Sequence, residues 1–363
     1  MRTIITFLDG IVATSMPYNE FVLFRAKHYK NELQHLIICG KHMEIPQEAA
    51  LDNLRIDFIG DNLFKWRSSI KRIISEYKDM NYPYVIHLHQ AGPSMKILLL
   101  MLGTGFRKKT VFTVHSTFSG YRVHNKIRSY LDGLLSRYVV CCSQFSLSHY
   151  PISLKKIKGE RVLAIQNGVD ISRIDSIVSN CQKKVHDDVV FVYVARMVPI
   201  KNHNLILDIA HVVSGKVKFL LIGDKDDAII RRIKEENLED KVYYTGLVPR
   251  TKVFEMLLES DVYISTSKLE GLPVSVLEGM YVGLPAILSD IPQHREISGN
   301  STFVRIVPNY VEEWISVINN LLEKEREDLS LMGEQSKEFV KNNFSLERMH
   351  KQYDVIYSKI YKL

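Results

Sequence analysis

The sequence predicts an α/β protein of two domains, each built on a parallel β-sheet with helices on both faces. Thirteen short apolar runs alternate with longer segments of helical period, which is the pattern of βαβ units. Most runs are continuously apolar, as expected for strands that are buried on both faces. The polar stretch 168–188 divides them into two series and is the predicted linker.

The predicted strands are short and lie in apolar, β-branched runs. Those of the first series are 3–8, 35–39, 55–59, 84–88, 110–115, 138–142 and 162–165. Those of the second series are 189–195, 217–222, 241–244, 261–265, 285–289 and 303–307. Ligands of such sheets bind at the carboxyl ends of the strands, so functional residues are expected directly after strands.

Composition excludes several classes of protein. The 363 residues are 46% hydrophobic and 25% charged, as in soluble globular proteins, and no apolar run approaches the roughly 18 residues that span a bilayer. Four cysteines without a CxxC pair argue against a disulfide framework and a zinc site. The N-terminus reaches Asp9 too soon to hold the apolar core of a signal peptide. We therefore expect a cytoplasmic protein with reduced thiols.

Positive charge is concentrated in the first half of the chain. Residues 1–180 hold 24 Lys and Arg against 14 Asp and Glu, whereas residues 181–363 hold 24 against 27. A basic half attracts anions such as nucleic acid, anionic lipid or a phosphorylated substrate. A solvated basic surface explains the same asymmetry.

The first motif is E-G-L-P-V-S-V-L-E-G-M at residues 270–280, after the predicted strand 261–265. Pro273 suits the first turn of a helix, and the free N–H groups of Leu272, Val274 and Ser275 would then face an anion. The carboxylates at 270 and 278 suit sugar diols. The alternative is an ordinary strand–turn–helix unit with two surface glutamates.

A pair of cations forms the second motif. Arg196 and Lys201 bracket a proline loop after the predicted strand 189–195. A guanidinium fork and an ammonium together match a diphosphate. The alternative is two solvated basic residues on a turn. Two further strands end in glycine, at Gly223 and Gly246, and either glycine also fits a plain strand exit.

Together these motifs resemble the C-terminal domain of the family 4 glycosyltransferases, which have the GT-B fold of two Rossmann-like domains with parallel sheets facing a central cleft. The glutamates are spaced as in the family, with seven residues between them, and a G-x-P strand follows at 283–285. The Arg/Lys pair and the N-G-V-D segment 167–170 match in order and spacing. The match covers most of residues 160–300 and is weaker before them.

The resemblance implies an acceptor-binding domain at 1–176 and a donor-binding domain at 177–345, with a last helix, 346–363, crossing back to the first domain. It implies that Arg196 and Lys201 hold the donor diphosphate. Glu270 would bind the donor sugar hydroxyls and Glu278 the ribose. The nucleotide sugar would also meet a set of backbone positions: Gly223, Gly246, Val248, Gly271, Leu272, Pro273 and Val274.

A histidine ends the predicted strand 110–115, where family members often carry one that approaches the donor sugar. His115 is therefore a candidate for a polar contact near the anomeric carbon, although a histidine satisfied by backbone is the alternative. His87 and His89 end the preceding strand; a structural role is expected for His87. The loop after the first strand departs from the family, because only Gly10 is glycine there.

The segment 64–78 predicts a basic amphipathic helix, with Trp66, Ile70 and Ile73 on one face. A core-facing helix is the main interpretation. A helix lying on an anionic membrane is the alternative, and the basic segments 107–109 and 155–158 add to it.

The resemblance thus implies a retaining, metal-independent hexosyltransferase that uses a nucleotide sugar, with a UDP-sugar as the expected donor and no cofactor. The acceptor would be a saccharide or a lipid-diphosphate-linked saccharide of surface polysaccharide biosynthesis, met in the cytoplasm or at the inner face of the plasma membrane. Two alternatives are a nucleotide-sugar epimerase of the same fold and a basic nucleic-acid-binding protein. No nucleic-acid-binding motif supports the second, so no nucleic-acid partner is expected.

Overall fold

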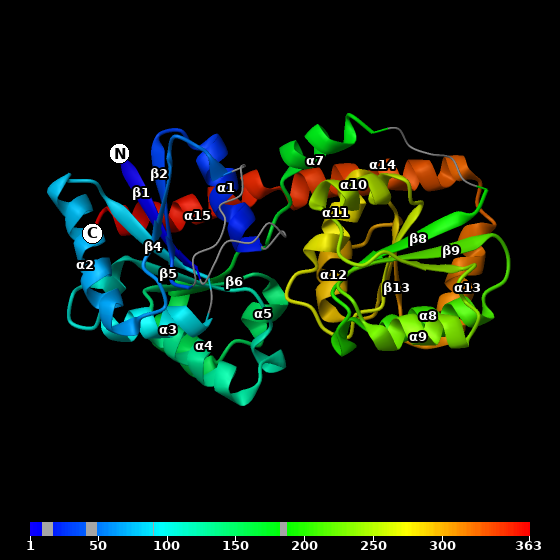
Figure 1. The fold of residues 1–363 in the computed structure, drawn as a ribbon, viewed down its shortest axis with the longest axis horizontal. Helices are drawn as coiled ribbons and strands as arrows, with labels where there is room; N and C mark the ends of the chain where they lie inside the picture. The colour runs from blue at the N-terminus through cyan, green and yellow to red at the C-terminus, as the bar shows by residue number, and fades with distance from the viewer. Residues whose placement is uncertain (9–16, 41–48, 90, 182–186) are drawn as a thin grey trace. The chain divides into compact units, whose positions relative to one another are not determined.

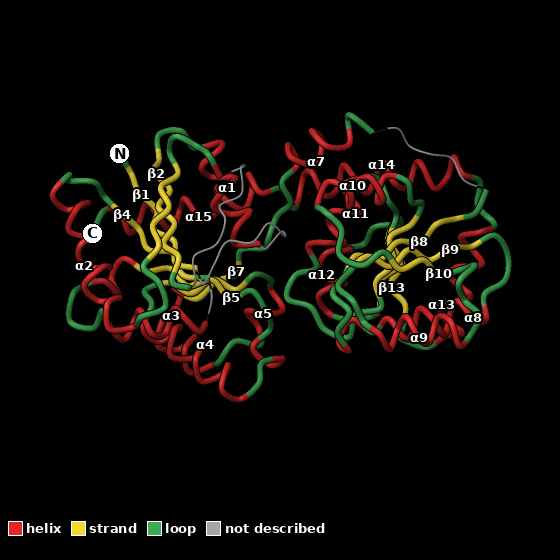
Figure 2. Tube along the Cα trace, in the orientation of Figure 1, coloured by secondary structure: helices red, strands yellow, loops and turns green. Residues whose placement is uncertain are grey.

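The computed structural model divides into two compact α/β units (Figure 1). It describes residues 1–8, 17–40, 49–89, 91–181 and 187–363. Unit 1 comprises Met1–Asn167 and Leu346–Leu363, and unit 2 comprises Gly168–Ser345. In each unit a sheet lies between layers of helices (Figure 2).

The sheet of unit 1 has seven parallel strands in the order β3-β2-β1-β4-β5-β6-β7. Their bounds are β1 Arg2–Leu8, β2 Glu32–Ile38, β3 Leu54–Phe58, β4 Tyr84–Leu88, β5 Thr110–Val114, β6 Tyr138–Cys141 and β7 Val162–Ala164. The helices are α1 Pro17–His28, α2 Leu63–Asp79, α3 Ala91–Leu100, α4 Val123–Leu135, α5 Gln144–Ser148, α6 Ile152–Lys158 and α15 Leu346–Tyr361.

The sheet of unit 2 has six parallel strands in the order β10-β9-β8-β11-β12-β13. Their bounds are β8 Val189–Val194, β9 Val217–Ile222, β10 Val242–Tyr244, β11 Val262–Ser265, β12 Ala286–Ser289 and β13 Val304–Val307. The helices are α7 Ile171–Val178, α8 His203–Val212, α9 Asp227–Glu235, α10 Arg250–Leu258, α11 Val274–Val282, α12 Pro292–Ser298, α13 Val311–Leu322 and α14 Arg326–Asn343. All thirteen predicted strands are present, each within a few residues of its predicted bounds.

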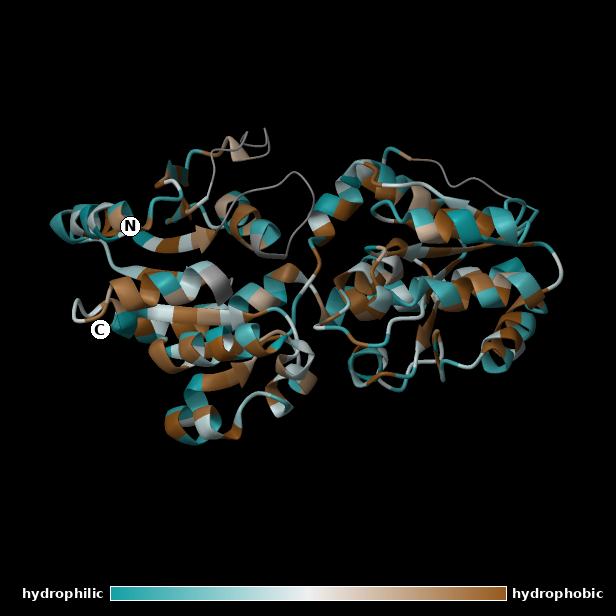
Figure 3. Ribbon diagram, turned by 60° about the horizontal axis from the view of Figure 1, so that its bottom comes forward, coloured by the Kyte–Doolittle hydropathy of each residue, from teal (hydrophilic) through white to brown (hydrophobic). Residues whose placement is uncertain are grey.

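The two faces of the first sheet explain its continuously apolar strands. Val85 of β4 packs with α1 and α15 on one face. The next residue, Ile86, packs with α2 and α3 on the other. Successive residues of a strand point to opposite faces, so a strand covered on both sides is apolar at every position. The strands are accordingly mostly brown in Figure 3, while the helices mix brown and teal.

The segment predicted as a linker is partly helical. Asp170 caps α7 by accepting a hydrogen bond from the Arg173 N–H (3.1 Å), and the Tyr281 hydroxyl of α11 donates to Asp175 (2.9 Å). Because α7 packs on α10 and α11, it belongs to unit 2. The boundary therefore falls after residue 167 rather than after residue 176.

Candidate functional site

The strand order of unit 2 changes direction between β8 and β11, which are hydrogen-bonded neighbours. In open parallel sheets, ligands bind beyond the carboxyl ends of the strands beside such a switch point. Residues 195–202 follow β8 and residues 266–273 follow β11. These two segments carry Arg196, Lys201 and Glu270, so three of the predicted site residues lie at the switch point.

Hydrogen bonds hold the two segments against each other. The Thr266 hydroxyl donates to the carbonyl oxygens of Lys201 (3.1 Å) and Asn202 (3.0 Å). The Lys268 N–H donates to the carbonyl of Ile200 (2.8 Å). The backbone on both sides of the Lys201 side chain is therefore positioned by the segment after β11.

This arrangement brings Lys201 and Glu270 into an ion pair. Lys201 Nζ lies 2.5 Å from Glu270 Oε1, and the Ser267 hydroxyl donates to the same oxygen (2.6 Å). The exposed fractions of the two charged side chains are 19% and 11%. Partial burial strengthens such a pair, yet both groups keep a path to solvent. A cation and a carboxylate are thus presented together at the switch point.

Arg196 has a different environment from Lys201, with which the sequence predicts it to act. Its side chain is exposed, and it forms no ion pair with any residue in the described part of the chain. The sequence predicts that Arg196 and Lys201 face the same space, whereas Lys201 is paired with Glu270. The sequence offers no signal for that pair, because its members are 69 positions apart.

A buried histidine is connected to the same site through hydrogen bonds. His294 of α12 is fully buried, and its Nδ1 lies 2.8 Å from the Ser289 carbonyl. The Ser289 hydroxyl donates to the Ser267 carbonyl (2.5 Å). Burial lowers the pKa of His294 to about 4, so this imidazole is neutral near pH 7 and its Nδ1–H donates. The chain from His294 to Ser267 positions the hydroxyl that contacts Glu270, and the sequence analysis missed it.

The second predicted glutamate is buried rather than on the surface. Glu278 lies on α11 with 3% of its area exposed. Arg250, the first residue of α10, reaches it through both guanidinium NH2 groups, one of them 3.1 Å from Oε2. The same guanidinium lies over the ring of Phe254, 4.8 Å from its centroid. A buried carboxylate needs such a partner, and Arg250 is a site residue that sequence analysis missed.

The glycines at two strand ends have packing roles. A Cβ on Gly223 would lie 2.0 Å from the Ala195 carbonyl oxygen, so the turn after β9 can approach the segment after β8 only with glycine there. The next residue, Asp224, accepts a hydrogen bond from the Met197 N–H (2.5 Å). Gly246 has a φ of +73°, which favours glycine.

The start of α11 differs in detail from the expectation. The Val274 N–H donates to the Leu272 carbonyl (2.9 Å), so it is not free to face an anion as predicted. Leu272 is 6% exposed and packs inward. Pro273 is the N-cap residue, without a side-chain cap, and Gly271 lies in the preceding bend. One of the three N–H groups predicted to face an anion, that of Val274, is therefore already hydrogen-bonded within the turn.

Three histidines of unit 1 lie at or just after the ends of strands β4 and β5. His115 Nε2 lies 3.0 Å from His89 Nδ1. Burial lowers the pKa of His115 to about 4 and that of His89 well below its usual value, so both are neutral near pH 7 and one donates to the other. His87 bonds the hydroxyls of Thr113 and Tyr357, both at 2.7 Å, which is the structural role expected for it. The loop with Gly10 lies outside the described residues.

The amphipathic helix is a core helix. Trp66, Ile70 and Ile73 of α2 are at most 3% exposed and pack into the core of unit 1. An apolar face that is already covered cannot enter a bilayer, so the alternative of a membrane-surface helix is wrong for this segment. Across the described part of the chain, none of the helices is both long and apolar enough to span a bilayer.

Two family models together match most of the chain. Residues 178–342 match the model described as Glycosyl transferases group 1, and residues 34–173 match the one described as Glycosyltransferase Family 4. The poly(ribitol-phosphate) alpha-N-acetylglucosaminyltransferase of Staphylococcus aureus is 30% identical over 36% of this chain and 28% of its own length. The capsular polysaccharide biosynthesis glycosyltransferase CapH of S. aureus is 21% identical over 79% of this chain and 81% of its own length.

The match to several curated relatives is partial: three of them are covered over only 28%, 42% and 64% of their own length. Among solved structures, Anabaena HepE in complex with UDP aligns with a TM-score of 0.76 and 16% identity, over 99% of this chain and 100% of that one. At that identity the likeness establishes the GT-B fold.

Proposed function

Because the chain belongs to glycosyltransferase family 4, we propose that it is a retaining hexosyltransferase that moves a sugar from a UDP-sugar to a saccharide acceptor. The observation that carries the proposal is the arrangement of unit 2. Lys201 and Glu270 are paired at the switch point, and the buried carboxylate of Glu278 is presented by the helix that begins there. Cations suit a diphosphate and carboxylates suit sugar and ribose hydroxyls.

In the proposed reaction, the bond between the anomeric carbon and the diphosphate oxygen breaks, and a bond to an acceptor hydroxyl oxygen forms on the same face. The hydroxyl proton passes to the leaving diphosphate. Lys201 and Arg196 would stabilise the charge that develops on that leaving group. Positive side chains can do this without a metal, so we propose metal independence. Glu270 would orient the sugar hydroxyls and Glu278 the ribose.

His115 is proposed to donate or accept one hydrogen bond to the sugar. Its low pKa supports a neutral imidazole, which can hydrogen-bond a hydroxyl without adding charge. The preference for uridine rests on the solved structures of the same fold that hold UDP or UDP-glucose.

The relatives and the charge of the chain support a proposal for the class of acceptor. The two staphylococcal relatives act, by their names, on poly(ribitol-phosphate) and in capsular polysaccharide biosynthesis. Together with the positive net charge of residues 1–180, this favours an anionic saccharide or a lipid-diphosphate-linked saccharide of a surface polymer. Such acceptors would be met in the cytoplasm, at the inner face of the plasma membrane.

A nucleotide-sugar panel tests the proposal directly. A ligand at 100 times its dissociation constant stabilises the protein by about 2.7 kcal/mol, so the matching sugar among UDP-, GDP- and ADP-glucose or N-acetylglucosamine raises the melting temperature. The effective donor is then incubated with and without a saccharide acceptor, with and without EDTA. We expect transfer only with acceptor, unaffected by EDTA, and an anomeric coupling constant that shows retention. Conversion of the donor without acceptor would mean an epimerase, and no thermal shift with any sugar would contradict the proposal.

A further inference from the structure

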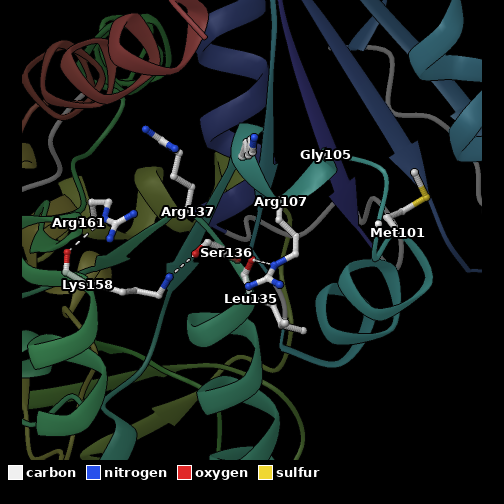
Figure 4. Close-up of a pocket in the computed structure, with 10 residues that line it drawn as sticks. Met101, Gly105, Arg107, Leu135, Ser136, Arg137, Lys158 and Arg161 are labelled. Carbon is white, nitrogen blue, oxygen red and sulfur yellow. Dashed lines mark hydrogen bonds between the residues drawn. The ribbon is translucent and has the colours of Figure 1, made fainter.

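A hollow of about 330 Å³ lies in unit 1 at the amino ends of β5, β6 and β7 (Figure 4). Residues just before each of these strands contribute to it. His115 lies just after the carboxyl end of β5, at the opposite end of the same strand, so the hollow is separate from the histidine that is a candidate for contact with the donor sugar. Ten residues line it, among them Arg107, Lys108, Arg137, Lys158 and Arg161.

All the charged residues that line the hollow are cations. Half of the ten lining residues are Lys or Arg, and none is Asp or Glu. Within the described ranges, none of the five cations forms an ion pair with a carboxylate. Like charges confined to one hollow repel each other, and a protein keeps such an arrangement most readily where an anion compensates it.

Two of the five cations bind backbone carbonyls at the carboxyl end of helix α4. Arg107 donates to the carbonyls of Leu134 (3.3 Å) and Leu135 (2.8 Å), and the Lys158 ammonium donates to the carbonyl of Ser136. Cations are favourable at the carboxyl end of a helix, so these two have a structural role. Figure 4 shows both side chains converging on this helix end.

The other three cations do not bind the end of α4. Arg161 donates one N–H to the Lys158 carbonyl (3.2 Å), and the rest of its guanidinium has no further hydrogen-bond partner among the residues that the structure describes. Arg137 has a buried Nε without a hydrogen-bond partner among the described residues. Lys108 is exposed. A buried donor without an acceptor is unfavourable, and an incoming oxyanion would supply the missing acceptor.

We propose that this hollow binds a phosphate group. Arginine forks match the oxygens of a phosphate in pairs, and a lysine adds a point charge. Burial lowers the pKa of Lys158 to about 8, and the guanidiniums of Arg161 and Arg107 act in the same direction; a bound anion offsets that repulsion. The phosphate is supplied either by a lipid headgroup or by a soluble phosphorylated molecule, because both present the same oxygens. The proposal does not depend on the transferase activity.

The test compares two triple variants of the full chain. Lys108→Gln, Arg137→Gln and Arg161→Gln together remove three charges from the hollow while keeping the cations that cap α4. The matched control is Lys65→Gln, Lys71→Gln and Arg72→Gln, which removes three charges from exposed positions of α2 in the same unit. Inorganic phosphate is titrated by calorimetry, and sedimentation is measured with phosphatidylcholine vesicles that contain or lack phosphatidylglycerol.

We expect the hollow variant to bind phosphate at least about tenfold more weakly than the wild type, with the control within twofold. Loss of sedimentation with the anionic vesicles in the hollow variant alone identifies a lipid headgroup. Loss of phosphate binding without any vesicle binding in the wild type identifies a soluble ligand. Equal phosphate affinities of the hollow variant and the control overturn the proposal. Should the triple variant not fold, Lys108→Gln and Arg161→Gln, both at exposed positions, carry the same comparison singly.

Discussion

At the scale of single residues, both glutamates of the candidate site are already paired with cations before any ligand arrives. Lys201 meets Glu270, and Arg250 meets Glu278. In each case a carboxylate that suits a hydroxyl is oriented by a cation. A ligand diphosphate near Lys201 would compete with Glu270 for the ammonium, which would leave the carboxylate ready to accept a hydroxyl hydrogen bond. Substitutions that remove one partner therefore affect two functions at once.

Replacing Lys201 by Ala should reduce turnover roughly ten- to a hundredfold, because a lost charge-assisted contact is worth about 1.5–3 kcal/mol. The measurement is the initial rate of sugar transfer at saturating donor. Lys268→Ala is the matched control, since that lysine is exposed on the neighbouring segment and uses only its backbone to hold residue 200. An unchanged rate in Lys201→Ala would contradict a role for this ammonium at the diphosphate.

Replacing Arg250 by Ala removes the guanidinium that contacts both oxygens of the buried Glu278 carboxylate, and this should lower the free energy of unfolding by about 3–5 kcal/mol. Lys252→Ala, which removes an exposed pair with Glu255 on the same helix, should change it by less than about 1 kcal/mol. Urea denaturation of both variants gives the comparison. The double variant Arg250→Ala, Glu278→Gln should be more stable than Arg250→Ala alone; if it is not, the buried charge is not the cause.

At the scale of elements, the sequence predicts what depends on continuous runs and misses what depends on contacts between distant segments. Strands β4 and β9 have the bounds that their apolar runs predict. Helix α7 was missed because its eight residues lie in a polar stretch and are held by packing on α10 and α11. The pairing of Arg250 with Glu278 joins positions 28 apart, and no local pattern encodes it.

The packing of α11 on β11 should make residue 279 intolerant of any side chain. A Cβ on Gly279 would lie 2.2 Å from Cδ2 of Tyr263, whose ring is fully buried. Gly279→Ala should therefore displace α11, which also carries Glu278, and lower the free energy of unfolding by about 1–3 kcal/mol. Donor affinity, measured by thermal shift, should fall in parallel. A Gly279→Ala variant of wild-type stability and donor affinity would show that the helix is free to shift at no cost.

At the scale of the whole molecule, the two units differ in how many buried histidines they hold. Among the residues that the structure describes, unit 1 has five whose pKa is lowered by burial, and unit 2 has two. Those of unit 1 are His35, His87, His89, His115 and His350. Those of unit 2 are His203 and His294. One group in unit 1 acts in the opposite direction, because burial raises the pKa of Asp132 to about 9.

Acid should therefore destabilise unit 1 more steeply than unit 2. A histidine held neutral by folding binds its proton in the unfolded chain first, so stability is lost as the pH falls from about 6.5 to about 4, by up to about 1.4 kcal/mol per pH unit for each group. The raised pKa of Asp132 offsets the effect of one histidine on stability. Four uncompensated histidines therefore remain in unit 1, compared with two in unit 2. Each unit has its own tryptophan, Trp66 in α2 and Trp314 in α13. Urea denaturation of Trp314→Phe and Trp66→Phe, followed by fluorescence at pH 7 and pH 5, reports the units separately. We expect a single-tryptophan signal from Trp66 whose midpoint falls further between the two pH values than that from Trp314, and equal shifts would mean that the histidines of unit 1 are not kept neutral by burial.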